Sequence, residues 1–120
     1  MTLGLFSEKL SSMADSGAEE YRDYVRGMFS KSALEGALIK RDAARLIHLY
    51  LYMILGEKDL DWGEYGKLKD IYECRICSNA IAQVCIKGIM NPEKENEFGV
   101  FREVDDKEAE ELIRIVSKRK

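Results

Sequence analysis

The chain has 120 residues, of which 46% are apolar and 34% charged, a composition typical of one globular domain and not of a disordered chain. Its 19 basic and 22 acidic residues are intermingled and give a formal net charge of −3, so we expect no general attraction to nucleic acid or anionic lipid. The one cationic cluster, Lys118-Arg119-Lys120, is interpreted as the complement of a helix dipole.

The first part of the chain predicts two amphipathic helices separated by a short break. One helix covers about residues 3 to 14, because apolar side chains recur there at helical spacing. The break at residues 15 to 17 contains Gly17, which suits the start of a second helix that runs from about residue 19 to residue 31. A loop through Gly36 is expected to follow.

The most apolar stretch of the chain, residues 46 to 55, holds nine apolar or aromatic residues and one histidine. It belongs to a predicted helix from about residue 40 to residue 55, which Gly56 ends. Ten helical residues rise about 15 Å, half of a bilayer's hydrocarbon core, so a membrane span is not expected. A helix that is apolar nearly all round lies at the centre of a bundle or against a second subunit. Tyr50 or Tyr52 should therefore contact a partner on any face left open.

The second part of the chain predicts a polar connection followed by further helices. Residues 57 to 66 form the connection, a short helical turn is expected at residues 67 to 72, and a helix at about residues 73 to 87. Asp105 with Glu108 resembles a capping box that opens the last helix. No prolonged strand pattern occurs, so the predicted fold class is all-α.

Two stretches of the chain echo each other. Residues 38 to 47 echo residues 104 to 113, and residues 24 to 28 echo residues 85 to 89. The echo predicts one helix-loop-helix unit used twice in a single domain, at about residues 18–56 and about residues 67–117.

The second unit resembles the S-layer homology (SLH) repeat. That family begins with F-x-D-V, continues with a helix that ends in G-I and a G-x-F element, and closes with the helix I-T-R-A-E-A-A-x-L-I. The matching segments here are Leu68-Lys69-Asp70-Ile71, residues 76 to 81, Gly88-Ile89, Phe98-Gly99 with Phe101, and residues 104 to 113. The resemblance implies a small orthogonal helical bundle of two units plus an N-terminal helix, and a bacterial source.

In the SLH family, the Thr-Arg pair of the closing motif contacts an anionic, pyruvylated cell-wall polysaccharide. The corresponding residues here are Ile39-Lys40 and Asp105-Asp106. Lys40 keeps the charge of the family's anion-contact position but lacks the fork of a guanidinium, and Asp106 reverses the charge. The resemblance therefore implies the fold more than the glycan site. Binding to cell-wall polysaccharide is kept as an alternative function.

The three cysteines, Cys74, Cys77 and Cys85, form an odd set, and the N-terminus resembles no secretory signal. Both features favour the reducing cytoplasm and free thiols. Together with His48, the cysteines suggest a Cys3His zinc site, but the second close ligand pair of such sites is missing. We therefore expect core cysteines and no metal or cofactor, with a small zinc-binding protein as an alternative.

No catalytic motif is present, so we expect no enzyme. His48, the only histidine, is predicted to be a neutral, hydrogen-bonded core or interface residue. A polar-aromatic cluster in the connection suggests binding anchors, because Trp and Tyr bury a large area at low entropic cost. The predicted function is a cytoplasmic, non-catalytic protein-interaction module that forms a homodimer or that binds or neutralises another protein. Its predicted contact residues are Trp62, Tyr65, Tyr72, Tyr50 and Tyr52.

Overall fold

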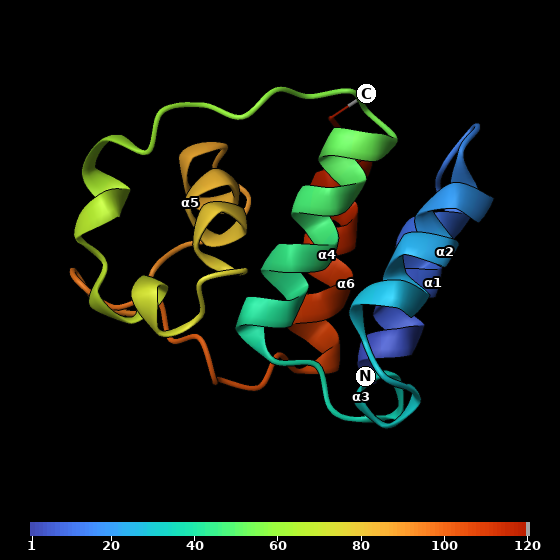
Figure 1. Ribbon diagram of the computed structural model, residues 1–120, viewed down its shortest axis with the longest axis horizontal. Helices are drawn as coiled ribbons and strands as arrows, with labels where there is room; N and C mark the ends of the chain where they lie inside the picture. Colours follow the sequence, from blue (N-terminus) through green and yellow to red (C-terminus); the bar gives the residue numbers. More distant parts are fainter. Residues whose placement is uncertain (120) are drawn as a thin grey trace.

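The computed structural model describes residues 1–119, and for Glu73 the backbone alone. In this part of the chain there are only isolated bridges between extended residues and no strands, which confirms the predicted all-α class (Figure 1). The α-helices are α1 (Leu3–Ser12), α2 (Ala18–Met28), α3 (Lys31–Glu35), α4 (Lys40–Met53), α5 (Ser78–Ile86) and α6 (Asp106–Ser117). Two 3₁₀ helices, η1 (Gly63–Lys67) and η2 (Lys69–Glu73), lie between α4 and α5.

Helices α1 and α2 pack against each other and against α4. In α2, Tyr21 and Val25 are buried as their spacing predicts, whereas Tyr24, which the same spacing placed on the buried stripe, is 61% exposed. Leu3, Phe6 and Leu10 of α1 are buried, as their spacing predicts. Helix α2 ends at Met28, three residues before the predicted end, because the backbone of Phe29 is extended (φ −127°, ψ 139°). This extension turns the Phe29 side chain into the core.

Helix α3 replaces part of the loop that the sequence predicts. The hydroxyl oxygen of Ser30 accepts a hydrogen bond from the Ala33 N–H at 3.1 Å, which caps the helix at its N-terminus. The helix has five residues and no buried side chain, so apolar periodicity gives no signal for it.

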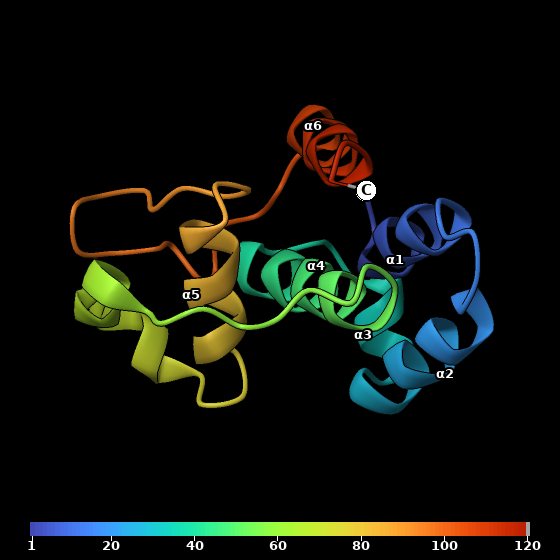
Figure 2. The ribbon, with the colours of Figure 1, turned by 90° about the horizontal axis from the view of Figure 1, so that it is seen from above.

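Helix α4 lies at the centre of the molecule, between α5 on one side and α1 and α2 on the other (Figures 1 and 2). Leu46, Ile47 and Leu51 are fully buried. As expected of so apolar a helix, α4 lies where the two parts of the chain meet. Its last residue is Met53, before the left-handed turn at Gly56 (φ 67°). No helix within residues 1–119 is long and apolar enough to cross a membrane.

Helix α5 begins at Ser78, five residues later than predicted. The preceding residues form η2 and an extended Cys74 (φ −132°, ψ 101°), so the apolar spacing there does not continue as one helix. The helix ends in a Schellman motif, in which the Ile89 N–H donates to the Val84 carbonyl at 2.9 Å and the Gly88 N–H to the Cys85 carbonyl at 3.0 Å. Gly88 has the required positive φ of 73°.

Helix α6 begins with half of the predicted capping box. The Asp105 carboxylate accepts a hydrogen bond from the Glu108 N–H at 2.8 Å. The Glu108 carboxylate does not return the bond, because it accepts hydrogen bonds from Arg102 at 2.8 and 2.7 Å. At the other end of α6, Arg119 pairs with Glu57 at 2.6 Å, whereas Lys120 of the basic cluster lies outside the described residues.

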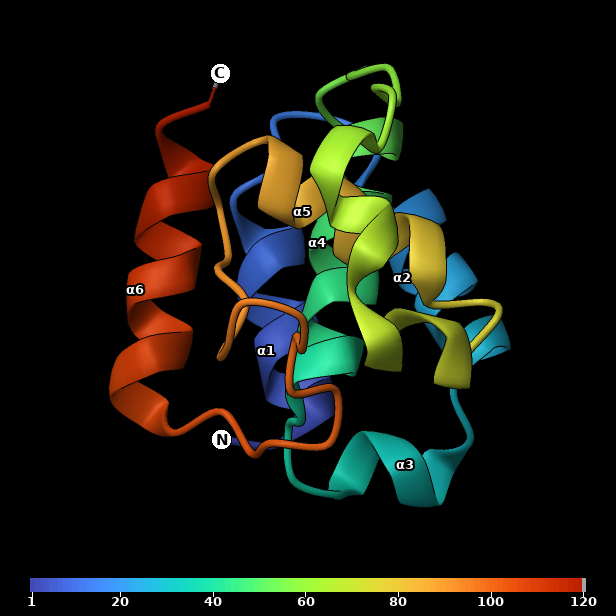
Figure 3. The same ribbon diagram turned by 90° about the vertical axis from the view of Figure 1, so that its left-hand side faces the viewer.

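Helices α4 and α6 run in the same direction, and the extended residues before them are joined (Figures 1 and 3). The Val104 N–H donates to the Leu38 carbonyl at 2.8 Å, and the Lys40 N–H donates to the Arg102 carbonyl at 2.8 Å. Leu38 and Val104 are the residues at which the two echoing stretches begin. The two stretches thus meet at corresponding positions.

Candidate functional site

The connector, defined here as residues 57–62, passes along α5 after leaving α4 (Figure 1). Gln83, which is fully buried, holds it at its middle. The Gln83 side-chain N–H donates to the Leu60 carbonyl at 2.8 Å, and its side-chain oxygen accepts the Leu60 N–H at 2.8 Å. One turn further along α5, Lys87 donates to the Lys58 carbonyl at 2.9 Å. The side chains of Gln83 and Lys87, four residues apart, therefore fix the path of the connector.

Asn79, one turn before Gln83, extends the same polar row. Its side-chain N–H donates to Asp59 at 2.8 Å, and its oxygen accepts the Trp62 indole N–H at 2.9 Å. Spacing of four residues places Asn79 and Gln83 of α5, and Lys87 directly after its end, on one face. The row was not recognised from the sequence, although its spacing is visible there.

His48 joins α4 to the connector by a hydrogen bond between its Nε2 and an Asp59 carboxylate oxygen, 2.7 Å apart. His48 is hydrogen-bonded as predicted, but its side chain is 22% exposed and lies at the rim of the core and not inside it. Burial alone would raise the pKa of Asp59, but hydrogen bonds from His48 and Asn79 outweigh it, so that this pKa lies below its usual range.

The aromatic residues predicted as binding anchors gather beside the connector. The Trp62 and Tyr72 rings lie 6.4 Å apart between centroids, and the Tyr72 hydroxyl donates to the Gly66 carbonyl at 2.6 Å. Tyr72 is 59% exposed, whereas Trp62 and Tyr65 are partly buried against the core. Tyr65 also lines an open hollow of about 520 Å³. The structure therefore brings these predicted residues together.

Two exposed apolar side chains in the same part of the chain were missed by the sequence analysis. Leu60 is 51% exposed although its backbone is held by Gln83, and Ile76 is 74% exposed. The signal for Ile76 is its phase, because it falls outside the apolar stripe that begins at Cys77 and continues through Ile81. We call the exposed and partly buried apolar set from this region the connector surface; its members are Leu60, Trp62, Tyr65, Tyr72 and Ile76.

The two tyrosines of α4 differ in exposure. Tyr50 is 1% exposed, and its ring meets that of Tyr21 edge to face with centroids 5.8 Å apart. Its position in the helix faces the core, which corrects the expectation that Tyr50 contacts a partner. Tyr52 is 64% exposed, so its predicted partner contact stays a prediction.

Lys40, the position that the SLH resemblance assigns to anion contact, lies inside the molecule and is 2% exposed. Its ammonium donates to the carbonyls of Asn91 at 2.5 Å and Phe98 at 2.7 Å, and to the Glu93 carboxylate at 2.9 Å. These contacts match the three donors of an ammonium. The hydrogen bond from Lys40 is also the main reason that the pKa of Glu93 lies below its usual range. An external anion would have to displace these partners.

Asp70 also binds the loop that supplies the acceptors of Lys40, at residues 98 to 100. Its carboxylate accepts hydrogen bonds from the N–H groups of Phe98 at 2.7 Å, Gly99 at 2.7 Å and Val100 at 3.1 Å. Gly99 has a positive φ of 86°, and a Cβ there would lie 2.5 Å from Cγ of Glu93. The two segments compared with F-x-D-V and G-x-F therefore form one internal contact.

The cysteines differ from the expected free thiols. Cys74 and Cys77 form a disulfide, which corrects that expectation for this pair, while Cys85 is free and buried. An odd count requires only one unpaired cysteine, and a turn of three residues brings the first two close enough to pair, with Cα atoms 5.2 Å apart. Burial raises the pKa of the Cys85 thiol to about 12, as suits a small core residue.

The structure offers no assembled ligand set for the zinc alternative. Among the side chains that the structure describes, which exclude that of Glu73, there is no cluster of three or more His, Cys, Asp or Glu that could hold a metal ion. The sulfurs of Cys74 and Cys77 form a disulfide, and the Nε2 of His48 is hydrogen-bonded to Asp59.

In comparisons with known proteins, no family model, curated protein or solved structure matches this chain. The SLH-like interpretation thus depends on the sequence motifs alone and stays a prediction.

Proposed function

We propose that this protein is a non-catalytic interaction module that binds a protein partner through the connector surface. The observation that supports this proposal is the combination of exposed apolar side chains with a firmly held backbone. Leu60 is 51% exposed, while its main-chain N–H and carbonyl are both hydrogen-bonded to the buried side chain of Gln83. The side chain is thus presented to the outside by a main chain that is already in place.

Such a surface favours association because little order has to be gained on binding. A loop that is held in its bound shape avoids most of the entropic cost of docking. Trp62 and Tyr72 add large, stiff rings whose polar atoms are already bonded to Asn79 and Gly66. Aromatic anchors surrounded by apolar side chains are typical of the residues that dominate binding energy.

The partner is either a second copy of this chain or a different protein, including one that the module would neutralise. Light scattering over a range of concentrations distinguishes these cases for the purified protein. Growth of the mass to twice that of the monomer indicates the homodimer, and a constant monomer mass indicates a different protein.

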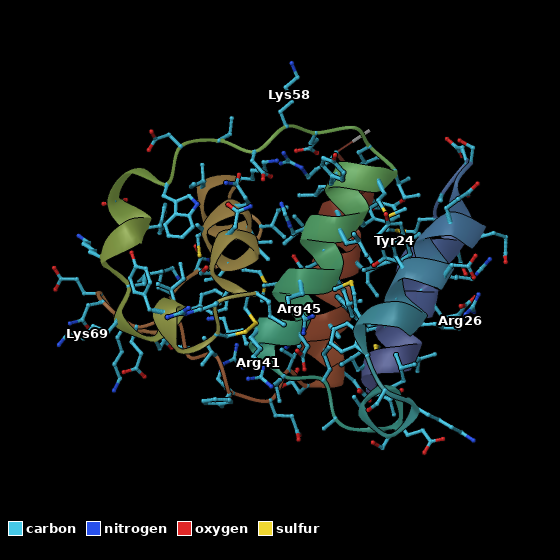
Figure 4. All side chains as sticks on the ribbon, viewed as in Figure 1. Tyr24, Arg26, Arg41, Arg45, Lys58 and Lys69 are labelled. Atoms are coloured by element: carbon cyan, nitrogen blue, oxygen red, sulfur yellow. A yellow bond between two sulfur atoms is a disulfide. The ribbon has the colours of Figure 1, made fainter. Side chains whose placement is uncertain are left out.

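Site-specific photo-crosslinking in the native cell tests the surface itself. A benzophenone amino acid replaces Ile76 in one variant and Tyr24 in another; both native side chains are more than half exposed, but Tyr24 belongs to α2 (Figure 4). We expect the probe at Ile76 to give one defined adduct, and the probe at Tyr24 to give none. Adding Tyr72→Glu should abolish the adduct at Ile76. Equal adducts at both positions, or an adduct unaffected by Tyr72→Glu, would contradict the proposal.

A further inference from the structure

Two arginines on successive turns of α4 have an unusual environment. Arg41 and Arg45 lie one turn apart on the helix (Figure 4). The Arg41 guanidinium carbon lies 5.1 Å from the centroid of the Phe101 ring, and that of Arg45 lies 4.5 Å from the centroid of the Phe29 ring. Contact of a guanidinium with a ring face restrains its position and leaves its N–H groups for other partners.

Among the described residues, these two side chains have only long ion-pair contacts to one carboxylate. The nearest carboxylate oxygen belongs to Asp42, at 3.6 Å from Nε of Arg41 and 3.7 Å from Nη1 of Arg45. Both separations exceed hydrogen-bond length. Nε of Arg41 is buried and has no hydrogen-bond partner among the described residues. By contrast, Arg102 and Arg119 each hold a carboxylate by two N–H groups.

The cluster also carries an uncompensated charge in a partly desolvated place. Two guanidiniums and one carboxylate give a net charge of +1, and the side chains of Arg45 and Asp42 are only 13% and 12% exposed. Burial lowers the pKa of Arg45 and raises that of Asp42, as expected when charged groups lose water. Buried donors without acceptors cost free energy, and such groups commonly mark the place of a missing ligand, ion or water.

The main-chain N–H groups at the start of α4 do not contribute to this environment. The N–H of Lys40 donates to the Arg102 carbonyl at 2.8 Å, and that of Arg41 donates to the Val100 carbonyl at 3.1 Å. The unused donors therefore belong to the two side chains and not to the helix terminus.

We propose that Arg41 and Arg45 form a binding site for one carboxylate group, supplied by an acidic side chain of a partner or by a small organic acid. A carboxylate is planar and accepts paired N–H groups from a guanidinium edge. One added carboxylate brings the charge of the cluster to zero. The site involves neither the connector surface nor Lys40, so it is independent of the proposed function.

Arginine side-chain NMR tests the site directly. Sodium acetate is titrated into the ¹⁵N-labelled protein at constant ionic strength, with sodium chloride as the balancing salt, while the Nε–Hε resonances are followed. We expect saturable shifts at Arg41 and Arg45. The controls are Arg26 and Arg114, which are exposed and already paired with Asp23 and Glu111, and which should not shift. Equal, non-saturating shifts at all arginines would overturn the proposal.

Two variants separate a specific site from a general attraction of charge. Arg41→Lys keeps the charge but loses the planar fork, and should weaken acetate binding about tenfold, as read from Arg45. Phe101→Leu keeps both charges and removes the ring under Arg41; because Phe101 is 62% exposed, this variant should fold, and it should also weaken binding. Unchanged acetate affinity in both variants would overturn the proposal.

The same titration with sodium phosphate tests the choice of ligand chemistry. A planar carboxylate should bind more tightly than a tetrahedral phosphate at equal ionic strength, because its two oxygens match the guanidinium edge. Saturable binding of phosphate without binding of acetate would overturn the carboxylate assignment. None of these measurements depends on the crosslinks at Ile76, so each proposal can fail alone.

Discussion

The part of the chain before Gly56 and the part after it are held together in different ways. Before Gly56, helices bury apolar faces against one another, with Phe6, Tyr21 and Leu51 in the shared core. After it, the segments on either side of α5 contain two short 3₁₀ helices and long loops but no other α-helix before α6, and buried polar side chains hold their main chain. Asp70 and Gln83 provide the clearest cases. The difference shows that a segment without apolar periodicity can be held as closely as a helix when buried side chains satisfy its peptide groups.

The largest effect is expected from the apolar part. Replacing Leu46, fully buried in α4, by alanine should lower the free energy of unfolding by about 3 kcal/mol, because it leaves a cavity in the core. Urea denaturation followed by circular dichroism measures the loss. Leu5→Ala is the control, because Leu5 is 48% exposed on α1 and its truncation should change the stability by less than about 0.5 kcal/mol.

The polar part should be nearly as sensitive at Asp70. Asp70→Ala leaves three N–H groups without their acceptor and should cost about 2–3 kcal/mol. Hydrogen exchange of Phe98, Gly99 and Val100 should accelerate more than that of α1. Asp61→Ala is the control, because the exposed Asp61 accepts only one N–H, from Gly63. Equal losses in the two variants would contradict the interpretation of Asp70 as a main-chain clamp.

A smaller effect is expected at the connector. Gln83→Leu keeps the buried volume but removes both bonds to Leu60, and should cost about 1–2 kcal/mol because water can replace part of what is lost. Amide exchange in the connector should accelerate while α1 and α2 stay protected. Ser78→Ala serves as the control, because the partly buried Ser78 at the start of α5 donates to the Arg75 carbonyl and not to the connector. Unchanged exchange in the connector would show that Gln83 does not hold it.

The smallest effect concerns pH. The hydrogen bond from Arg119 is the main reason that the pKa of Glu57 is lowered in the folded protein. A lowered folded-state pKa contributes stability above the unfolded value of about 4.3, and this contribution is lost as the pH falls through the folded value. Glu57→Gln should therefore cost less than about 1 kcal/mol at pH 7 and flatten the fall in stability below about pH 4.3. An acid profile identical to that of the native chain would contradict this assignment.

The helices themselves could largely be predicted from the sequence, because side-chain periodicity reports directly on which faces are buried. The stripe of α1, the central place of α4 and the cap at Asp105 all follow from such local signals. The short α3 and the late start of α5 could not be predicted in the same way. A five-residue helix has too few turns for a stripe, and the residues before α5 combine helical spacing with a disulfide turn.

The polar contacts were harder to predict because each depends on the path of a distant loop. The SLH resemblance assigned Lys40 to an external anion, yet its acceptors come from residues more than fifty positions away in the same chain. The recurrence of polar residues every four positions at Asn79, Gln83 and Lys87 was a local hint of such contacts. The exposure of single side chains was equally difficult to predict, because Tyr50 is buried whereas Tyr52, two residues later, is exposed.

The pairing of Leu38 with Val104 has a consequence for how the chain folds. The acceptors for the N–H groups of Lys40 and Arg41, and those for the Lys40 ammonium, all lie in residues 91 to 102, whereas the next two N–H groups of α4 donate to Ile39. The start of the central helix therefore completes its hydrogen bonds only after a loop of more than fifty residues has closed, which raises the contact order and slows folding. A chain ending at Gly56 would lack all of these distant acceptors, so the ribosome completes nearly the whole protein before the start of α4 has its native hydrogen bonds.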